Sequence, residues 1–154
     1  MKKVFIYLLL LLLVACQSPP FQDKENKLKK MLANYQKPSI LDKQVYLITI
    51  TGGCGGCMQV VADYIKENIA DEKHYFIVSC PSQKEVSFTF NYQIRHHANF
   101  LIDNQMIAVR DELVGDIHPK VYYCKNGNII NEEEITFTNA KQVFANIKIF
   151  LDRQ

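Results

Sequence analysis

The sequence has no run of basic residues interleaved with aromatics, and its formal net charge is only +2. Domains that bind nucleic acid concentrate lysine and arginine on one face, so the composition gives no case for this function. It also has no second Cys-x-x-Cys pair and no His-x-x-x-His, which leaves a structural zinc site two ligands short. Haem attachment needs a histidine directly after the pair, and Met58 stands there. The pair Cys54 and Cys57 therefore needs another explanation.

The start of the chain resembles an export signal. Lys2 and Lys3 precede an almost purely apolar run over residues 4–15, too short to span a bilayer comfortably. Leu-Val-Ala before Cys16 resembles the lipobox of bacterial lipoproteins, in which the cysteine thiol receives a diacylglycerol. We therefore predict a lipoprotein signal peptide at residues 1–15 and a lipid on Cys16. Two or three acyl chains would hold the protein firmly at a membrane surface.

Residues 16–44 are predicted to be a lipidated tether, because prolines and many charges begin this segment. A short helix is expected near residues 23–35. Its apolar face would comprise Leu28, Met31, Leu32 and Tyr35. No chemistry is expected in the segment. The mature protein should face an oxidising space on the outer side of a bacterial membrane, such as the periplasm.

The cleaved chain of roughly 140 residues has a length suited to one domain with an adequate core, and that domain is expected at residues 45–154. Residues 45–51 are rich in β-branched side chains and nearly uncharged, which predicts a strand buried on both faces. Apolar residues recur at helical spacing from Cys57 onward, so a helix should begin within the cysteine motif. Residues 74–80 predict a second strand, ended by Pro81. Together these elements predict a right-handed βαβ unit with parallel strands.

Secondary structure is harder to predict after residue 81 and becomes clear again near the hairpin and the last helix. Residues 88–92 alternate weakly, residues 99–102 predict a short strand, and residues 104–114 predict a helix. Asn-Gly at 126–127 lies between two β-rich runs, the strongest short-range signal of a hairpin. A helix over residues 139–152 should close the chain, since its apolar residues form one stripe.

This order of elements, the Cys-Gly-Gly-Cys motif at residues 54–57 and His118-Pro119 ahead of the hairpin resemble the thioredoxin superfamily. The nearest resemblance is to its membrane-anchored thiol-disulfide branch, the TlpA-like and redoxin-like proteins, and it covers residues 45–151. It implies an α/β, thioredoxin-like fold in which helices flank a central mixed β-sheet. It also implies an insertion at about residues 82–114 and a cis-proline at Pro119, beside the cysteines.

Three positions depart from the usual pattern of that family. Gly53 stands where a tryptophan is usual, and the chain contains no tryptophan. Ile48 replaces a buried carboxylate that some members use to manage protons. Gly55 and Gly56 replace the more usual Gly-Pro. These departures make the redox potential unpredictable from the sequence.

The resemblance implies a redox-active pair that needs no bound cofactor or metal. A helix N-terminus favours a thiolate, so Cys54 is expected to be the nucleophile that attacks a substrate disulfide. Cys57, one turn further on, is expected to resolve the mixed disulfide. Gly55 and Gly56 would let a partner's backbone approach closely.

The loop at His118 and Pro119 is the other expected substrate-binding element, since its backbone could hold an extended segment. The charge of His118 could also tune the Cys54 thiolate, although packing alone would explain a histidine in a loop. His96 and His97 are expected to be solvated loop residues.

The two remaining cysteines, Cys80 and Cys124, are expected to be buried thiols. In a thioredoxin-like sheet they would end strands on opposite sides of the strand at residues 45–51, beyond the reach of a disulfide. A minor redox role for Cys80 stays open, because it would lie at the active-site end of the sheet.

The predicted function is thiol-disulfide exchange with proteins. The resemblance implies the direction of reduction, with recharging by a membrane thiol donor, whereas the same pair at a more oxidising potential would introduce disulfides instead. A copper-carrying lipoprotein is the first alternative, because two thiolates suit Cu(I). Against it, Gly52 stands where small copper-carrying domains have methionine, and those domains are about half as long. The second alternative is a scaffold lipoprotein with a permanent disulfide.

Overall fold

A computed structural model describes residues 20–37 and 44–153. The expected signal peptide and the expected lipidation site, Cys16, lie outside these residues. In chain order the elements are α2 (Gln22–Asn34), β1 (Val45–Ile50), α3 (Gly55–Asn68), β2 (His74–Ser79), α4 (Gln83–Thr89), α5 (Tyr92–Arg95), β3 (Phe100–Asp103), α6 (Ile107–Arg110), β4 (Lys120–Lys125), β5 (Asn128–Glu134) and α7 (Ala140–Asp152).

The five strands form one mixed sheet in the order β3-β2-β1-β4-β5. β1, β2 and β3 run parallel, whereas β4 is antiparallel to β1 and β5 is antiparallel to β4. The prediction of a mixed sheet flanked by helices is confirmed. In this topology the carboxyl ends of β1, β2 and β3 share an edge with the start of β4, so the segments attached there converge.

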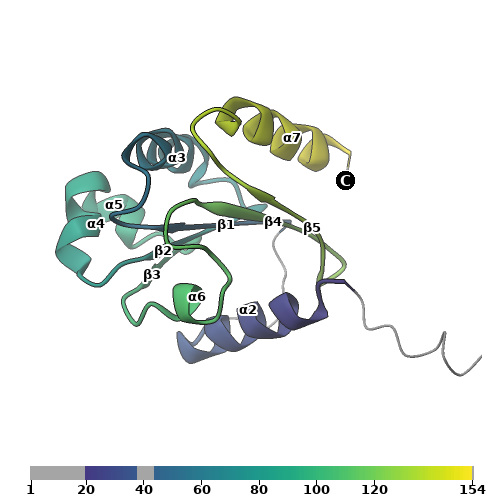
Figure 1. Ribbon diagram of the computed structural model, residues 1–154, viewed down its shortest axis with the longest axis horizontal. Coiled ribbons are helices and arrows are strands. Elements are labelled where there is room, and N and C mark those ends of the chain that lie inside the picture. Colours follow the sequence, from purple (N-terminus) through teal and green to yellow (C-terminus); the bar gives the residue numbers. More distant parts are fainter. Residues whose placement is uncertain (1–19, 38–43, 154) are drawn as a thin grey trace, which may run out of the picture.

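Both faces of the sheet are covered (Figure 1). Side chains alternate along a strand, so Val45 and Leu47 of β1 point to one face and Tyr46 and Ile48 to the other. The first pair belongs to a core completed by α3 and α7, and the second to a core completed by α2 and α6. This double burial explains why β1 carries no charge.

The helix predicted near residues 23–35 is confirmed as α2, and it is part of the folded body. Its apolar face, formed by Leu28, Met31 and Leu32, is buried against the sheet. At one end the carboxylate of Glu25 accepts a hydrogen bond from the amide of Ile129 in β5. Beyond the other end, the Tyr35 hydroxyl donates to Asp103 of β3 at 2.7 Å. α2 therefore crosses the sheet from β5 to β3.

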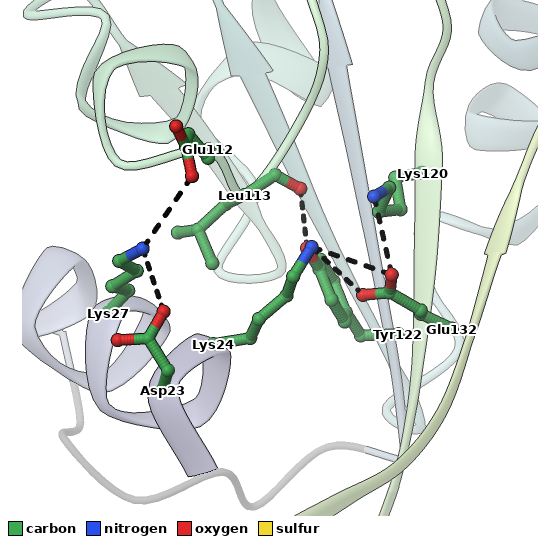
Figure 2. A network of polar contacts seen from close by, with 8 residues as sticks. All are labelled: Asp23, Lys24, Lys27, Glu112, Leu113, Lys120, Tyr122 and Glu132. Carbon is green, nitrogen blue, oxygen red and sulfur yellow. Dashed lines mark hydrogen bonds and ion pairs between the residues drawn. The ribbon is translucent and has the colours of Figure 1, made fainter. Parts of the chain in front are cut away.

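Ion pairs supplement this packing at the surface, as Figure 2 shows. Lys24 of α2 and Lys120 of β4 lie 3.3 and 3.4 Å from the two carboxylate oxygens of Glu132 in β5. Lys27 pairs with Asp23 one turn earlier at 2.8 Å. Partly exposed pairs of this kind contribute about 0–1 kcal/mol each, so apolar burial is the main term that holds α2. Within the described ranges, none of the helices is both long and apolar enough to cross a membrane.

The segment before β4 differs most from the sequence predictions. Two short helices, α4 and α5, form within residues 83–95, where only a weak alternation over residues 88–92 had a predictive value. The helix predicted over residues 104–114 is reduced to α6. Met106 and Glu112 adopt left-handed φ angles of 53° and 58°, which bound the helical turn on both sides. The buried carboxylate of Asp103 accepts hydrogen bonds from the first amides of α6, at Ile107 and Ala108.

The predicted hairpin is confirmed. Asn126 and Gly127 join β4 to β5 with φ angles of 54° and 76°, and two central residues with positive φ are typical of the tight turn between twisted strands. The cis-proline prediction is wrong: no peptide bond between described residues is cis, including the bond between His118 and Pro119. The trans form is the lower in energy for X-Pro, by about 0.5–1 kcal/mol. Here the Pro119 carbonyl also accepts a hydrogen bond from Ile135.

Candidate functional site

The site lies where β1 ends and α3 begins. Four residues, 51–54, connect them, and Gly52 among them has a φ of +82°, a conformation that costs glycine little. Cys54 is the N-cap of α3, and its sulfur accepts a hydrogen bond from the Cys57 amide at 3.3 Å. The buried strand thus leads directly into a helix whose first turn holds both cysteines. This local arrangement agrees with the strand, turn and helix that the sequence predicts.

Cys54 and Cys57 form a disulfide, with their Cα atoms 5.2 Å apart. The two residues differ in access. Cys54 is partly exposed, whereas Cys57 is fully buried in the core. Any group that attacks from solvent therefore meets Cys54 first, and Cys57 is placed to react only with Cys54.

The loop before β4 closes over this turn. The carbonyl oxygen of Ile117 accepts a hydrogen bond from the Cys54 amide at 3.0 Å. A Cβ atom added to Gly53 would lie 2.6 Å from the same oxygen, a distance that the backbone cannot tolerate without shifting. A glycine at position 53 is therefore required by this close approach of two backbones.

His118 follows Ile117 and lies beside the disulfide. Its Nδ1 atom is 3.8 Å from the sulfur of Cys57. Influence of its charge on the Cys54 thiolate stays a prediction, and the structure adds a contact with the buried sulfur of Cys57. The two sulfurs and one ring nitrogen all lie within 4.8 Å of one another. This group offers both redox-active and metal-ligating atoms.

The surface around the cysteines is apolar and partly open. A Cβ atom on Gly55 would meet nothing within 4 Å, whereas one on Gly56 would lie 3.1 Å from the ring of Phe137. Phe137 is 68% exposed and Ile117 is 55% exposed. The sequence reasoning missed Phe137, which follows β5 and carries no local signal that links it to a motif far away in the chain.

Two further contacts anchor the surrounding elements. The Thr49 hydroxyl donates to the sulfur of Met58 at 2.9 Å, which ties β1 to the first turn of α3. The Thr51 hydroxyl donates to the carboxylate of Glu85 in α4. Residues of the segment before β4 therefore border the site.

Cys80 and Cys124 are free, buried thiols. Burial raises the pKa of Cys80 to about 11 and that of Cys124 to about 12, mainly because a thiolate would be poorly solvated there. Both are therefore protonated at neutral pH and poor nucleophiles. The ring of His96 stacks on Tyr92, with centroids 3.9 Å apart, and His97 accepts a hydrogen bond from the Asn99 amide.

Comparison of the chain with family models, curated proteins and solved structures finds no match. The function is therefore argued from the residues and geometry of the site.

Proposed function

We propose that the protein is a thiol-disulfide oxidoreductase with a thioredoxin-like fold, which exchanges its Cys54-Cys57 couple with protein thiols and disulfides. The observation that carries the proposal is the asymmetry of the pair at the start of α3. One sulfur is accessible from solvent, and the other is buried directly behind it. Exchange through a mixed disulfide requires one accessible and one resolving thiol.

In the reductive direction, the Cys54 thiolate attacks one sulfur of a substrate disulfide and displaces the other as a thiolate. The mixed disulfide is then attacked at the Cys54 sulfur by Cys57. This step releases the second substrate thiol and leaves Cys54 and Cys57 oxidised, so two electrons have passed to the substrate. The Cys57 amide, which points at the Cys54 sulfur, and the helix N-terminus favour the attacking thiolate.

Substrate contact is assigned to the rim of the pair. Gly55 leaves open space next to Cys54, and the exposed side chains of Ile117 and Phe137 offer apolar contact. The backbone at His118 and Pro119 is the proposed support for an extended substrate segment. These groups lie in the segments attached to the edge of the sheet where β1 ends and β4 begins.

The proposal includes a membrane location. Cys16 would carry the lipid, and the folded body would face the periplasm, where a membrane thiol donor returns electrons to the pair. Support for this part comes from the lipobox-like sequence before Cys16. Incorporation of a labelled fatty acid into the wild-type chain, lost on Cys16→Ser, tests it.

A redox titration of the full chain carrying Cys16→Ser tests the chemistry, with alkylation and mass measurement to count thiols. A cooperative two-electron transition that Cys54→Ser abolishes is expected. A midpoint of about −270 mV would identify a reductant and one of about −120 mV an oxidant. After reduction, limiting iodoacetamide should modify Cys54 before Cys57. A pair that stays oxidised over this whole range would contradict exchange and support the scaffold alternative.

A further inference from the structure

The group formed by Cys54, Cys57 and His118 has a second chemical capability. Its ligand atoms come from the first turn of α3 and from the loop before β4, and all lie within 4.8 Å of one another. In the part of the chain that the structure describes, no second group of three histidine, cysteine or carboxylate side chains converges in this way. From this convergence we propose that the reduced site binds a single Cu(I) ion through both thiolates and His118 Nδ1.

The distances fit an ion between these atoms. Metal bonds of about 2.3 Å to sulfur and about 2.0 Å to imidazole nitrogen place those two ligands about 3.5 Å apart at a tetrahedral angle, and slightly farther at a trigonal one. The observed separation of Cys57 Sγ and His118 Nδ1 is 3.8 Å. The two sulfurs are bonded to each other in the disulfide and must separate to hold an ion, and reduction breaks that bond.

The ligand set selects the ion. Two thiolates are soft ligands, which favour Cu(I) and zinc over harder cations. A structural zinc site is four-coordinate, and the described part of the chain supplies only three ligands here. Cu(I) is satisfied by three. The full burial of Cys57 also shields one side of the ion from water.

The proposed binding is controlled by the redox state of the pair. The disulfide first takes two electrons and two protons from a dithiol, which itself becomes a disulfide. Cu(I) then displaces the two thiol protons and is held by the two thiolates. When a substrate disulfide then takes two electrons from the pair and leaves as two thiolates, Cys54 and Cys57 form their disulfide again, both sulfur ligands are lost and the ion is released. Metal binding and disulfide exchange thus use the same thiolates and exclude each other.

The test is an anaerobic titration of the reduced full chain, carrying Cys16→Ser, with Cu(I) in competition with a coloured chelator. One ion per chain is expected for the reduced protein and none for the disulfide form. His118→Ala should weaken binding by at least about 10-fold, since even the second-shell partners of a metal act on that scale. His96→Ala, at the histidine stacked on Tyr92, is the matched control and should leave the affinity unchanged. X-ray absorption should report two sulfur ligands and one nitrogen.

Any vicinal pair of thiols has some affinity for Cu(I), so the result for His118→Ala decides. Equal affinities of this variant and the parent protein, or an absorption spectrum with sulfur ligands alone, would overturn the proposal. The two proposals also fail separately. A normal redox transition without copper binding that depends on His118 would overturn only the proposed copper site. Copper binding without exchange with protein disulfides would overturn only the proposed oxidoreductase function.

Discussion

The amide of Cys54 donates a hydrogen bond to the carbonyl oxygen of Ile117 at 3.0 Å. Through this bond, the residue that caps α3 is fixed to the loop that carries His118. The contact depends on Gly53, because any side chain at that position would meet the same carbonyl oxygen. The position of His118 beside the disulfide therefore rests on a glycine outside the Cys-x-x-Cys motif.

We predict that Gly53→Ala lowers the free energy of unfolding by about 1–3 kcal/mol, the usual cost of overpacking, because a Cβ would lie 2.6 Å from Ile117 O. Gly55→Ala is the matched control, since its Cβ would meet nothing within 4 Å. Urea unfolding of the oxidised proteins measures both. Equal stabilities of the two variants would show that the loop does not depend on Gly53.

We predict that Leu28→Ala in α2 destabilises the whole protein by about 2–5 kcal/mol, the range for buried leucines. Leu28 is fully buried in the core beneath the sheet, whereas Asn26 on the same helix is exposed. Asn26→Ala should change the stability by no more than about 0.5 kcal/mol. Thermal or urea unfolding in a single transition is the readout. A loss confined to helix content, with the main transition unmoved, would mean that α2 folds apart from the sheet.

We predict that protonation of His74 destabilises the fold at mildly acidic pH. Burial lowers the pKa of His74 below its ordinary 6.5, and nearby Asp71 offsets this only in part. As the pH falls, the unfolded chain therefore binds this proton first. The stability that the neutral His74 ring contributes is therefore fully present above about pH 6.5. Below that pH it is lost, at up to about 1.4 kcal/mol per pH unit.

The comparison for His74 is the free energy of unfolding at pH 7.5 and 5.5. His74→Gln should show a smaller loss between these values than the parent protein, while His96→Gln should keep the parent's loss. An unchanged loss in His74→Gln would locate the acid sensitivity elsewhere.

We predict that Cys80 and Cys124 stay unmodified when the native, oxidised protein meets excess iodoacetamide at pH 8. Their raised pKa values, about 11 and about 12, and their burial leave little thiolate and no access. Unfolding in urea should expose both to rapid alkylation, as mass measurement would show. Native labelling of Cys80 as fast as that of reduced Cys54 would revive a redox role for it.

The sequence predicted those elements whose signals are local. β1 and β2 follow from short apolar runs, the β4 and β5 hairpin from Asn126-Gly127, and α7 from one apolar stripe. The Cys-x-x-Cys pair at the start of α3 followed from the same local reading. In each case the deciding residues are close in the sequence, so the tertiary structure had little to add.

The sequence failed where the structure depends on distant contacts or short caps. The short helix α6 is set by the Asp103 carboxylate and by left-handed residues around it, and an aspartate ahead of the segment was the available signal. The trans bond at Pro119 departs from what the resemblance implied. The contact of His118 with Cys57 and the place of Phe137 both depend on how loops meet at the sheet edge.

The packing of α2 against the sheet also limits how far the folded body can lie from Cys16. Gln22, the first residue of α2, is six positions after Cys16, and six residues span at most about 20 Å. With the proposed lipid on Cys16, the folded body would be confined to a thin layer beside the bilayer. Partners anchored in the same membrane would then meet it at a much higher effective concentration than partners that diffuse freely. The short linker between Cys16 and α2 would thus favour membrane-bound partners without any additional binding surface.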